Sequence, residues 1–359
     1  MSRKVRLGLI GTGFISQGAH VKGYEQLADK CEVVTICDLK HETREIMRTK
    51  FGFTGANYTD DYKQILNDPD IDAVVIATPN AVHMQPTLDA LAAGKHVLCE
   101  KPLAMNAEQA KAMCRAAKDS GKILQVALQY RFSGFAQFTA EFIRNGHMGD
   151  IYFARARALR RRGVPGWGVF IDKEKQGGGP LIDIGVHILD LTLFLMGYPK
   201  PVAASGKTWD MLGKNPDNRN FWGEYDRDKF TVEDFAVGMI RFENGAVISL
   251  ESSFMANIEG DPMETQVFGT KAGAIVKALG EDPVTIFKQI DGQYFEMKPQ
   301  NIPHVESPYV AEIEAFVDAI QNGKPSPVPG ENGLTLNAIF DALYKSSASG
   351  KEELVNVDY

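Results

Sequence analysis

Short apolar runs alternate with helical patterns over the first 125 residues, and this alternation constrains the fold more than any other feature. Strands are expected at residues 5–10, 32–37, 73–77, 96–99 and 123–128, and helices at 14–27, 60–66, 82–93 and 107–118. Continuous apolar strands separated by helices are typical of a parallel sheet that is covered on both faces. Ligands of such sheets bind at the carboxyl ends of the strands.

A glycine turn at residues 11–16, Gly-Thr-Gly-Phe-Ile-Ser, follows the first strand and opens the first helix. Gly11 permits a tight turn, Gly13 lets a pyrophosphate approach the backbone, and the helix N-terminus supplies N–H donors. Asp38 ends the second strand, where a carboxylate can accept hydrogen bonds from the ribose hydroxyls of a dinucleotide. A simple strand–helix turn with an acidic residue nearby is the alternative interpretation.

The charge of Asp38 also bears on the choice of dinucleotide. A carboxylate at this position would repel the 2′-phosphate of NADP, so NAD is the predicted cofactor and NADP is disfavoured. Lys40 and Arg44 are close enough in the sequence to weaken that preference.

Length and composition indicate a two-domain protein, because 359 residues exceed what one hydrophobic core usually serves. The net charge of −7 argues against nucleic acid or an anionic membrane as a partner. No apolar run approaches the roughly 20 residues that cross a bilayer. The four cysteines contain no CxxC pair, which argues against a structural zinc site and suits a reducing cytoplasm.

A carboxylate and an imidazole lie four residues apart after three consecutive glycines at residues 177–179. Pro180 suits the first turn of a helix, and a helix beginning there would place Asp183 and His187 on one face. Asp183 could then orient His187 as a general base. The pair could equally be an ordinary contact on a helix surface.

Glu100-Lys101-Pro102 ends the strand that begins near residue 96. A lysine at a strand end facing the cofactor crevice could meet a substrate hydroxyl, although a surface Glu-Lys pair before a turn is common. At this point the chain resembles the glucose–fructose oxidoreductase and inositol dehydrogenase family (Gfo/Idh/MocA). The resemblance extends over essentially the whole chain and rests on four ordered elements: the turn at 11–16, Ala77-Thr78-Pro79-Asn80 with His83, Glu100-Lys101-Pro102, and the glycines at 177–179 followed by Asp183 and His187.

The resemblance implies an α/β Rossmann domain over residues 1–125. It also implies an α+β domain over 126–359 with a large, mostly antiparallel sheet, whose last helix could pack back on the first domain. In the family this sheet usually supplies the oligomer interface, so a homodimer or homotetramer is expected. The resemblance implies catalytic roles for Lys101, Asp183 and His187. Together with the turn and Asp38, the expected cofactor-binding residues are Gly11, Gly13, Phe14, Ile15, Asp38, Thr78, Pro79, Asn80, His83, Glu100, Lys101 and Gln129. Gln129 stands where many members have asparagine.

The remaining two-thirds of the chain read as strands flanked by helices, which is consistent with an α+β domain. Strands are expected at residues 151–162, 234–242, 246–254, 265–269, 273–277 and 284–290, and helices at 309–321 and 333–347. Glu243-Asn244-Gly245 predicts a hairpin between two of these strands. The polar and aromatic segment 209–228 reads as a long surface loop.

Candidate substrate contacts, besides Asp183 and His187, are Tyr130, Arg131, Arg160 and Trp167. An arginine here could bind a carboxylate, a phosphate or several hydroxyls, and Trp167 could cover the nicotinamide or stack on a sugar ring. Alternatively, the arginines face solvent and Trp167 packs under a loop.

The sequence therefore predicts a cytoplasmic NAD-dependent oxidoreductase that acts on a ring hydroxyl of a sugar, glycoside or inositol and needs no metal. His187 would take the hydroxyl proton while Lys101 stabilises the developing alkoxide, or Lys101 would itself carry the proton. Three alternatives stay open. NAD could be held tightly and used transiently for epimerisation or glycoside cleavage, the chain could be a non-enzymatic NAD-binding sensor, or the substrate could be a dihydrodiol or an imine.

Overall fold

The chain forms two compact units, and the computed structural model describes residues 3–280 and 282–359. The first unit comprises the chain up to residue 129, residues 306–334 and residue 359, and the second comprises residues 130–305 and 335–358. The predicted boundary lay between residues 125 and 126, so this division differs from it by four residues and by the later segments that join the first unit. Helix α10 (Pro308–Asn322) lies wholly in the first unit, whereas only the first turn of the last helix, α11 (Gly330–Ser349), does so.

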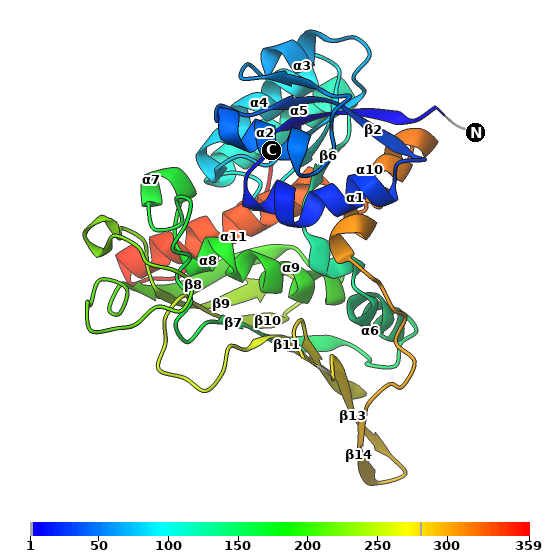
Figure 1. The fold of residues 1–359 in the computed structure, drawn as a ribbon. Coiled ribbons are helices and arrows are strands. Elements are labelled where there is room, and N and C mark those ends of the chain that lie inside the picture. The colour runs from blue at the N-terminus through cyan, green and yellow to red at the C-terminus, as the bar shows by residue number, and fades with distance from the viewer. Residues whose placement is uncertain (1–2, 281) are drawn as a thin grey trace. The chain divides into compact units, whose positions relative to one another are not determined.

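The first unit contains a parallel six-stranded sheet in the order β3-β2-β1-β4-β5-β6 (Figure 1). Its strands are β1 (Val5–Ile10), β2 (Cys31–Cys37), β3 (Asn57–Thr59), β4 (Ala73–Ile76), β5 (His96–Cys99) and β6 (Leu124–Val126). The order reverses between β1 and β4, which is the switch point of a doubly wound fold. The predicted Rossmann domain is confirmed, and the short polar strand β3 was not predicted.

Helices cover this sheet, and their apolar residues complete one core. They are α1 (Val21–Gln26), α2 (His41–Thr49), α3 (Lys63–Asn67), α4 (Met84–Ala92), α5 (Ala107–Ser120) and α10. Ile313, Phe316 and Val317 of α10 belong to the same buried cluster as Leu7 and Leu9 of β1. Each such side chain contributes about 1.5–3 kcal/mol by its burial, so α10 is an integral part of the first unit.

The second unit is built on a nine-stranded sheet in the order β14-β13-β12-β11-β7-β10-β9-β8-β15. Its strands are β7 (Ile151–Leu159), β8 (Pro201–Trp209), β9 (Phe235–Phe242), β10 (Val247–Ser253), β11 (Met263–Gly269), β12 (Ala272–Lys277), β13 (Val284–Ile290), β14 (Gln293–Met297) and β15 (Glu353–Leu354). β7 and β10 pair in parallel, and the other neighbours pair antiparallel. The predicted mostly antiparallel sheet and the β9–β10 hairpin are confirmed.

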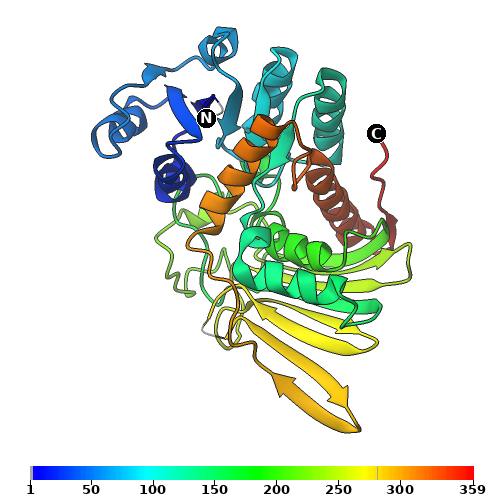
Figure 2. The ribbon, with the colours of Figure 1, turned by 90° about the vertical axis from the view of Figure 1, so that its right-hand side faces the viewer.

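One face of this sheet carries helices, and Figures 1 and 2 show α6 (Gly134–Arg144) and α9 (Gly185–Leu195) side by side on it. Strand β7 presents Ala154, Ala156 and Ala158 at alternate positions, all buried, and these small side chains let α9 approach closely. In the described part of the chain no single helix is long and apolar enough to span a membrane, although the bent pair at 173–183 and 185–195 passes that test on length and composition.

Candidate active site

The two glycines of the turn after β1 have different local reasons to be glycine. Gly11 has a φ of +95°, and a Cβ there would lie 2.5 Å from the carbonyl oxygen of Ala77. The buried Ser16 hydroxyl donates a hydrogen bond of 2.8 Å to the Gly11 carbonyl and closes the turn. A Cβ on Gly13 would meet no described atom within 4 Å. Gly11 therefore serves the fold, whereas Gly13 leaves open space above the turn.

Asp38 follows β2, and its carboxylate is joined to that turn. Its Oδ2 accepts hydrogen bonds from the N–H and the hydroxyl of Thr12, at 2.8 and 2.9 Å, and its Oδ1 accepts one from the Lys40 N–H at 2.9 Å. The Arg44 guanidinium donates to the main-chain carbonyl of Asp38 and not to its carboxylate. The predicted weakening of NAD preference by Arg44 therefore finds no support in this contact.

The predicted cofactor-binding residues divide by exposure. Surface is left on Gly11, Gly13, Phe14, Ile15, Asp38, Thr78, Pro79, Asn80 and Lys101, whereas His83, Glu100 and Gln129 are buried. Thr78 Oγ1 is a buried oxygen for which residues 3–280 and 282–359 supply no hydrogen-bond partner. An orphaned hydroxyl at the end of β4, the open space at Gly13 and the acceptor at Asp38 fit a dinucleotide at this sheet edge.

His83 supports the site from within, and its contact with the cofactor stays a prediction. The side chain is fully buried, with Nδ1 2.9 Å from the Pro102 carbonyl and Nε2 2.9 Å from the Thr78 carbonyl. Burial lowers the pKa of His83, although both carbonyls oppose this shift. A neutral ring donates to one of these carbonyls, and it ties the segment after β4 to the one that carries Lys101.

Glu100 is held by a histidine that the sequence did not single out. His20 Nε2 lies 2.9 Å from Glu100 Oε1, and the Lys101 N–H donates to Oε2 at 3.1 Å. Burial raises the pKa of Glu100, but His20 and the Lys101 charge outweigh burial and lower it overall. His20 ends a π-helical turn (Ser16–His20), a local widening that is frequent at functional sites.

Gln129 is the third buried residue of the predicted cofactor set. Its Nε2 donates to the Tyr309 hydroxyl at 3.2 Å, which joins the turn η3 (Gln129–Phe132) to α10. Its contact with the cofactor, like that of Glu100, stays a prediction.

In the second unit, the consecutive glycines at 177–179 are packed against the protein itself. A Cβ on Gly178 would lie 2.0 Å from the Tyr344 hydroxyl, and one on Gly179 would lie 2.1 Å from the Glu233 carbonyl oxygen. The Glu233 carboxylate accepts hydrogen bonds from Gly179 N–H at 2.9 Å, Leu181 N–H at 3.2 Å and Tyr344 Oη at 2.9 Å. Burial raises the pKa of Glu233, and these hydrogen bonds oppose that shift. Glu233, which sequence reasoning missed, thus fixes the start of the segment that carries Asp183.

The predicted helix begins at Pro180 but does not continue to His187, which corrects the expectation of one continuous face. Helix α8 (Pro180–Asp183) ends at Asp183, and α9 begins at Gly185. The Pro180 carbonyl accepts hydrogen bonds from the Ile184 N–H at 3.1 Å and from the Ser252 hydroxyl at 2.7 Å. This anchoring to β10 coincides with the break, which leaves Asp183 buried at one helix end and His187 half-buried at the start of the next.

Two predicted substrate residues lie beside these helices. The rings of Tyr130 and His187 have centroids 5.4 Å apart. Arg160, at the end of β7, interacts electrostatically with both Asp183 and Tyr130. Burial lowers the pKa of Arg160 although Asp183 and Tyr130 oppose that shift, and burial raises the pKa of Tyr130. Tyr130 and Arg160 are therefore neighbours of His187 and Asp183, respectively.

Arg131 has a structural role in the second unit, and its predicted contact with substrate is not tested by it. Its Nε donates to Asp190 of α9 at 2.9 Å, its Nη2 donates to the same carboxylate, and Nη2 also donates to the Tyr198 hydroxyl at 2.7 Å. Both side chains of the Arg131–Asp190 pair are almost completely buried. A buried, bidentate pair of this kind anchors α9, and the contact of Arg131 with substrate stays a prediction.

Trp167 lies in a cluster with an aromatic residue that sequence reasoning did not name. The Trp167 and Trp222 rings stack with centroids 6.1 Å apart and an interplanar angle of 10°. Trp222 comes from the segment 209–228, whose aromatic residues in a polar loop were the available signal. Across residues 3–280 and 282–359 no group of three or more His, Cys, Asp or Glu could hold a metal ion.

Comparisons with known proteins agree with this geometry. A family model of the Gfo/Idh/MocA oxidoreductases, described as an NAD-binding Rossmann fold, matches residues 5–128, and its C-terminal alpha/beta domain matches 140–357. D-glucoside 3-dehydrogenase of Escherichia coli (strain K12) is 37% identical over 351 residues, 97% of each chain. Levoglucosan dehydrogenase of Pseudarthrobacter phenanthrenivorans (strain DSM 18606 / JCM 16027 / LMG 23796 / Sphe3) is 33% identical, over 99% of this chain and 98% of that protein. A solved levoglucosan dehydrogenase complex with NADH has a TM-score of 0.85 at 26% identity, over 99% of this chain and 100% of that chain.

Proposed function

We propose that this chain, which belongs to the Gfo/Idh/MocA oxidoreductase family, transfers a hydride between NAD and a ring hydroxyl or ketone of a sugar, glycoside or inositol. The observation that carries the proposal is the support given to its acid–base residues. Asp183 and His187 flank a helix break that Glu233 and Ser252 anchor, and Lys101 follows a glutamate that His20 holds. Supports of this kind fix catalytic side chains in position.

NAD is the cofactor that the first unit suits. Gly13 leaves room for the pyrophosphate, Asp38 offers its carboxylate to the ribose, and Thr78 contributes an unpaired hydroxyl among the described residues. When bound, NAD supplies the acceptor for a hydride from the substrate carbon.

The acid–base residues of the chain handle the proton. In the oxidising direction a neutral His187 accepts the proton of the substrate hydroxyl, and Asp183 supports the resulting imidazolium. Lys101 donates a hydrogen bond to the same oxygen and stabilises its developing negative charge. The carbon loses a hydride and the oxygen loses a proton, so a secondary alcohol becomes a ketone and the electrons balance.

A polyhydroxylated substrate suits the chemistry of the second unit. Two relatives are named as dehydrogenases of a D-glucoside and of levoglucosan, both of them sugar derivatives. Arg160 and Tyr130 place a guanidinium and a phenol beside Asp183 and His187, and such groups hydrogen-bond to sugar hydroxyls.

The direct test is turnover with NAD across inositols, aldoses and glycosides, followed by the near-ultraviolet absorbance of reduced nicotinamide. His187→Ala and Lys101→Ala should each lower kcat by about 10² to 10⁴. His304→Ala and Lys63→Ala, at exposed positions, are matched controls. If both active-site variants kept full activity, the assignment would fail. Copurified NAD with no net NADH release would instead favour transient use of the cofactor.

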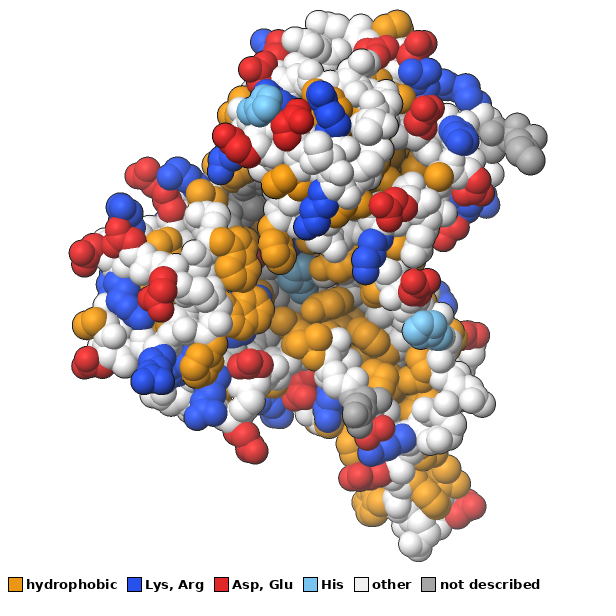
Figure 3. All heavy atoms as spheres, in the orientation of Figure 1, with side chains coloured by type: hydrophobic (Ala, Val, Ile, Leu, Met, Phe, Trp, Pro, Cys, Tyr) orange, Lys and Arg blue, Asp and Glu red, His pale blue; other side chains and the backbone are white. Residues whose placement is uncertain are grey.

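A homo-oligomer is part of the proposal, with a homodimer or homotetramer as the expected form. The sheet face opposite α9 presents Phe153 and Phe268, whose rings are 5.2 Å apart, and Met239, which is 46% exposed. Hydrophobic side chains also gather on the β13–β14 hairpin, where Tyr294 is 86% exposed (Figure 3). Met239→Glu should shift the mass measured by light scattering toward the monomer, and an unchanged mass would speak against this face.

Cytoplasmic localisation is likewise proposed. All four cysteines lie in the described part of the chain, where each is buried and free. Burial raises the pKa of the Cys37 thiol to about 12, so this side chain is a poor nucleophile. Free buried thiols are typical of proteins kept in a reducing compartment.

A further inference from the structure

Ring contacts and one electrostatic interaction connect His187 with the exposed Trp167–Trp222 pair. Tyr130 packs against the His187 ring, and Arg160 interacts electrostatically with Tyr130. The Arg160 guanidinium then lies over the Trp222 ring, 4.0 Å from its centroid, and Trp222 stacks on Trp167. Within the second unit, Asp183 and His187 are therefore connected to the two indoles through Tyr130 and Arg160.

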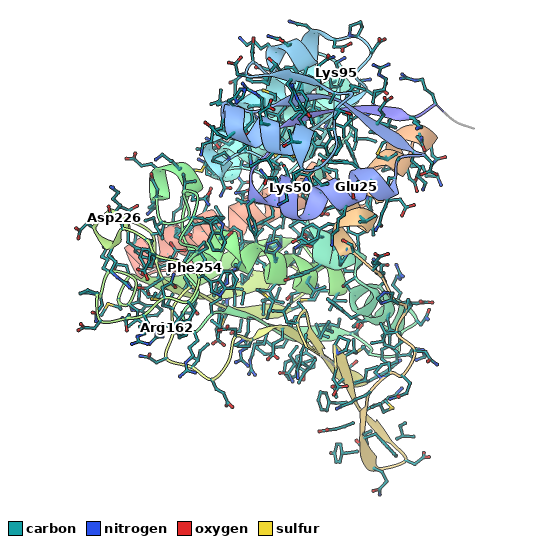
Figure 4. The ribbon with its side chains drawn as sticks, in the orientation of Figure 1. Glu25, Lys50, Lys95, Arg162, Asp226 and Phe254 are labelled. Atoms are coloured by element: carbon teal, nitrogen blue, oxygen red, sulfur yellow. The ribbon has the colours of Figure 1, made fainter. Side chains whose placement is uncertain are left out.

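The two tryptophans are exposed although the loops that carry them are well anchored. Trp167 and Trp222 are 40% and 39% exposed, which is unusual for large aromatic side chains that pack in pairs. Arg162 and Asp226, labelled in Figure 4, mark these two loops, and the labelled Phe254 lies with its ring centroid 5.6 Å from the Arg160 guanidinium. Part of each indole therefore stays exposed although the two rings stack on each other and Arg160 lies over Trp222.

The anchoring comes from hydrogen bonds between the loops. Asn220 accepts from the Val164 N–H at 3.0 Å and donates to the Val164 carbonyl at 2.7 Å. The Gly166 N–H donates to the Trp222 carbonyl at 2.8 Å, and a Cβ on Gly166 would lie 2.5 Å from the backbone of Gly223. The indole pair is thus pre-organised, which lowers the entropic cost of binding a ligand.

There is also room beyond the pair. A cavity of about 880 Å³ begins at Gly168, the residue after Trp167, and is lined by residues 168–175 except 170 and by Asp228, Lys229 and Thr231. Its rim carries charges of both signs, so it does not select a purely apolar group.

We propose that Trp167 and Trp222 form a second subsite, which binds a ring-bearing aglycone attached to the sugar that Asp183 and His187 act on. This inference rests on the proposed function and narrows its substrate class to glycosides with a ring aglycone. Flat apolar rings stack on indoles, whereas the small methyl group of a methyl glycoside gains little there. Arg160 joins the two subsites because it lies over Trp222 and interacts with Asp183.

The test compares phenyl and methyl β-D-glucopyranoside in two measurements on the intact chain. One is kcat/KM with NAD, and the other is the dissociation constant measured by calorimetry with NADH present. Trp222→Ala should reduce the preference for the phenyl glycoside about two- to tenfold in both measurements, since an aromatic pair contributes about 0.5–1.5 kcal/mol. Trp222→Phe should restore part of that preference.

Trp209→Ala is the matched control, because Trp209 is 38% exposed and has an aromatic partner, Phe235, at 5.9 Å. It should leave the phenyl preference unchanged. If the protein turns over the glucosides and Trp222→Ala leaves the phenyl preference unaltered, the subsite is overturned but the proposed function is not. If binding of the phenyl glucoside depends on Trp222 but neither glucoside is turned over, the result supports the subsite and counts against the proposed function. Absence of both binding and turnover with either glucoside overturns the subsite proposal.

Discussion

The glycine turn at residues 11–16 and the glycines at 177–179 differ in what occupies the space beside them. In the turn after β1, Gly11 is crowded by the Ala77 backbone, but Gly13 faces open space. In the segment 177–179, the space beside Gly178 is occupied by Tyr344, and the space beside Gly179 is occupied by Glu233. A glycine motif near an active site can therefore serve a ligand or serve packing, and only the surrounding atoms distinguish the two.

Gly11→Ala should have the largest effect on stability. The substitution imposes a positive φ on alanine and sets its Cβ 2.5 Å from a carbonyl oxygen. Backbone strain and overpacking together should lower the free energy of unfolding by about 3 kcal/mol or more. Urea unfolding followed by circular dichroism measures this. Gly52→Ala, with a φ of +73° but no described atom within 4 Å of the new Cβ, should cost only about 1 kcal/mol; equal losses would contradict the packing argument.

Gly178→Ala should destabilise the second unit by about 1–3 kcal/mol, because its Cβ would meet the Tyr344 hydroxyl at 2.0 Å. Adding Tyr344→Phe removes that oxygen, so the double variant should be more stable than the sum of the two single effects predicts. A double-mutant cycle by urea unfolding gives the coupling. Strictly additive effects would show that Tyr344 is not what requires glycine here.

Gly13→Ala should change the free energy of unfolding by less than about 0.5 kcal/mol, since its Cβ enters open space. Its affinity for NADH should fall about tenfold or more, because the methyl group occupies the path of the pyrophosphate. Calorimetric titration with NADH measures this loss. Gly18→Ala, also in open space, should keep native affinity. Unaltered binding by Gly13→Ala would place the pyrophosphate elsewhere.

The last prediction concerns pH and the buried support at His83. Burial lowers the folded-state pKa of His83 below the unfolded value of about 6.5. Its contribution is therefore complete above that value and is lost as pH falls toward the folded pKa, at up to about 1.4 kcal/mol per pH unit. The unfolding midpoint should drop between pH 7 and 5, and His83→Gln should drop less. Burial also lowers the pKa of His96, but His96 is present in the wild type and in His83→Gln alike. The difference between their two pH profiles therefore measures the contribution of His83. Parallel curves would refute this assignment.

Local patterns predicted much of the fold. The central strands of the first sheet are buried on both faces, so they appear as continuous apolar runs, and the β9–β10 hairpin is marked by Glu243-Asn244-Gly245. The turn at 11–16 was predictable because its geometry depends on adjacent residues. Strands β3, β14 and β15 were missed because they are short and largely polar or exposed.

The features that escaped prediction depend on residues far apart in the sequence. The buried ion pair of Arg131 was missed because its partner, Asp190, lies 59 residues later in the chain. The break at Ile184 coincides with an anchor on Ser252, and His20 meets Glu100 across the first unit. The position of Trp222 depends on the hydrogen bonds by which Asn220 joins its loop to Val164. Such partners have no local pattern.

Helix α10 has a consequence for how the protein is made. Its Ile313, Phe316 and Val317 complete the core of the first unit, and a Cβ on Gly23 of α1 would lie 2.6 Å from Ile313. During translation, residues up to 129 leave the ribosome about 180 residues before this helix, roughly ten to forty seconds at typical synthesis rates. During that time an apolar face of the nascent sheet stays uncovered, and chaperones have an opportunity to bind this face. A nucleotide-binding cassette grafted into another protein would therefore need α10 as well as the N-terminal segment.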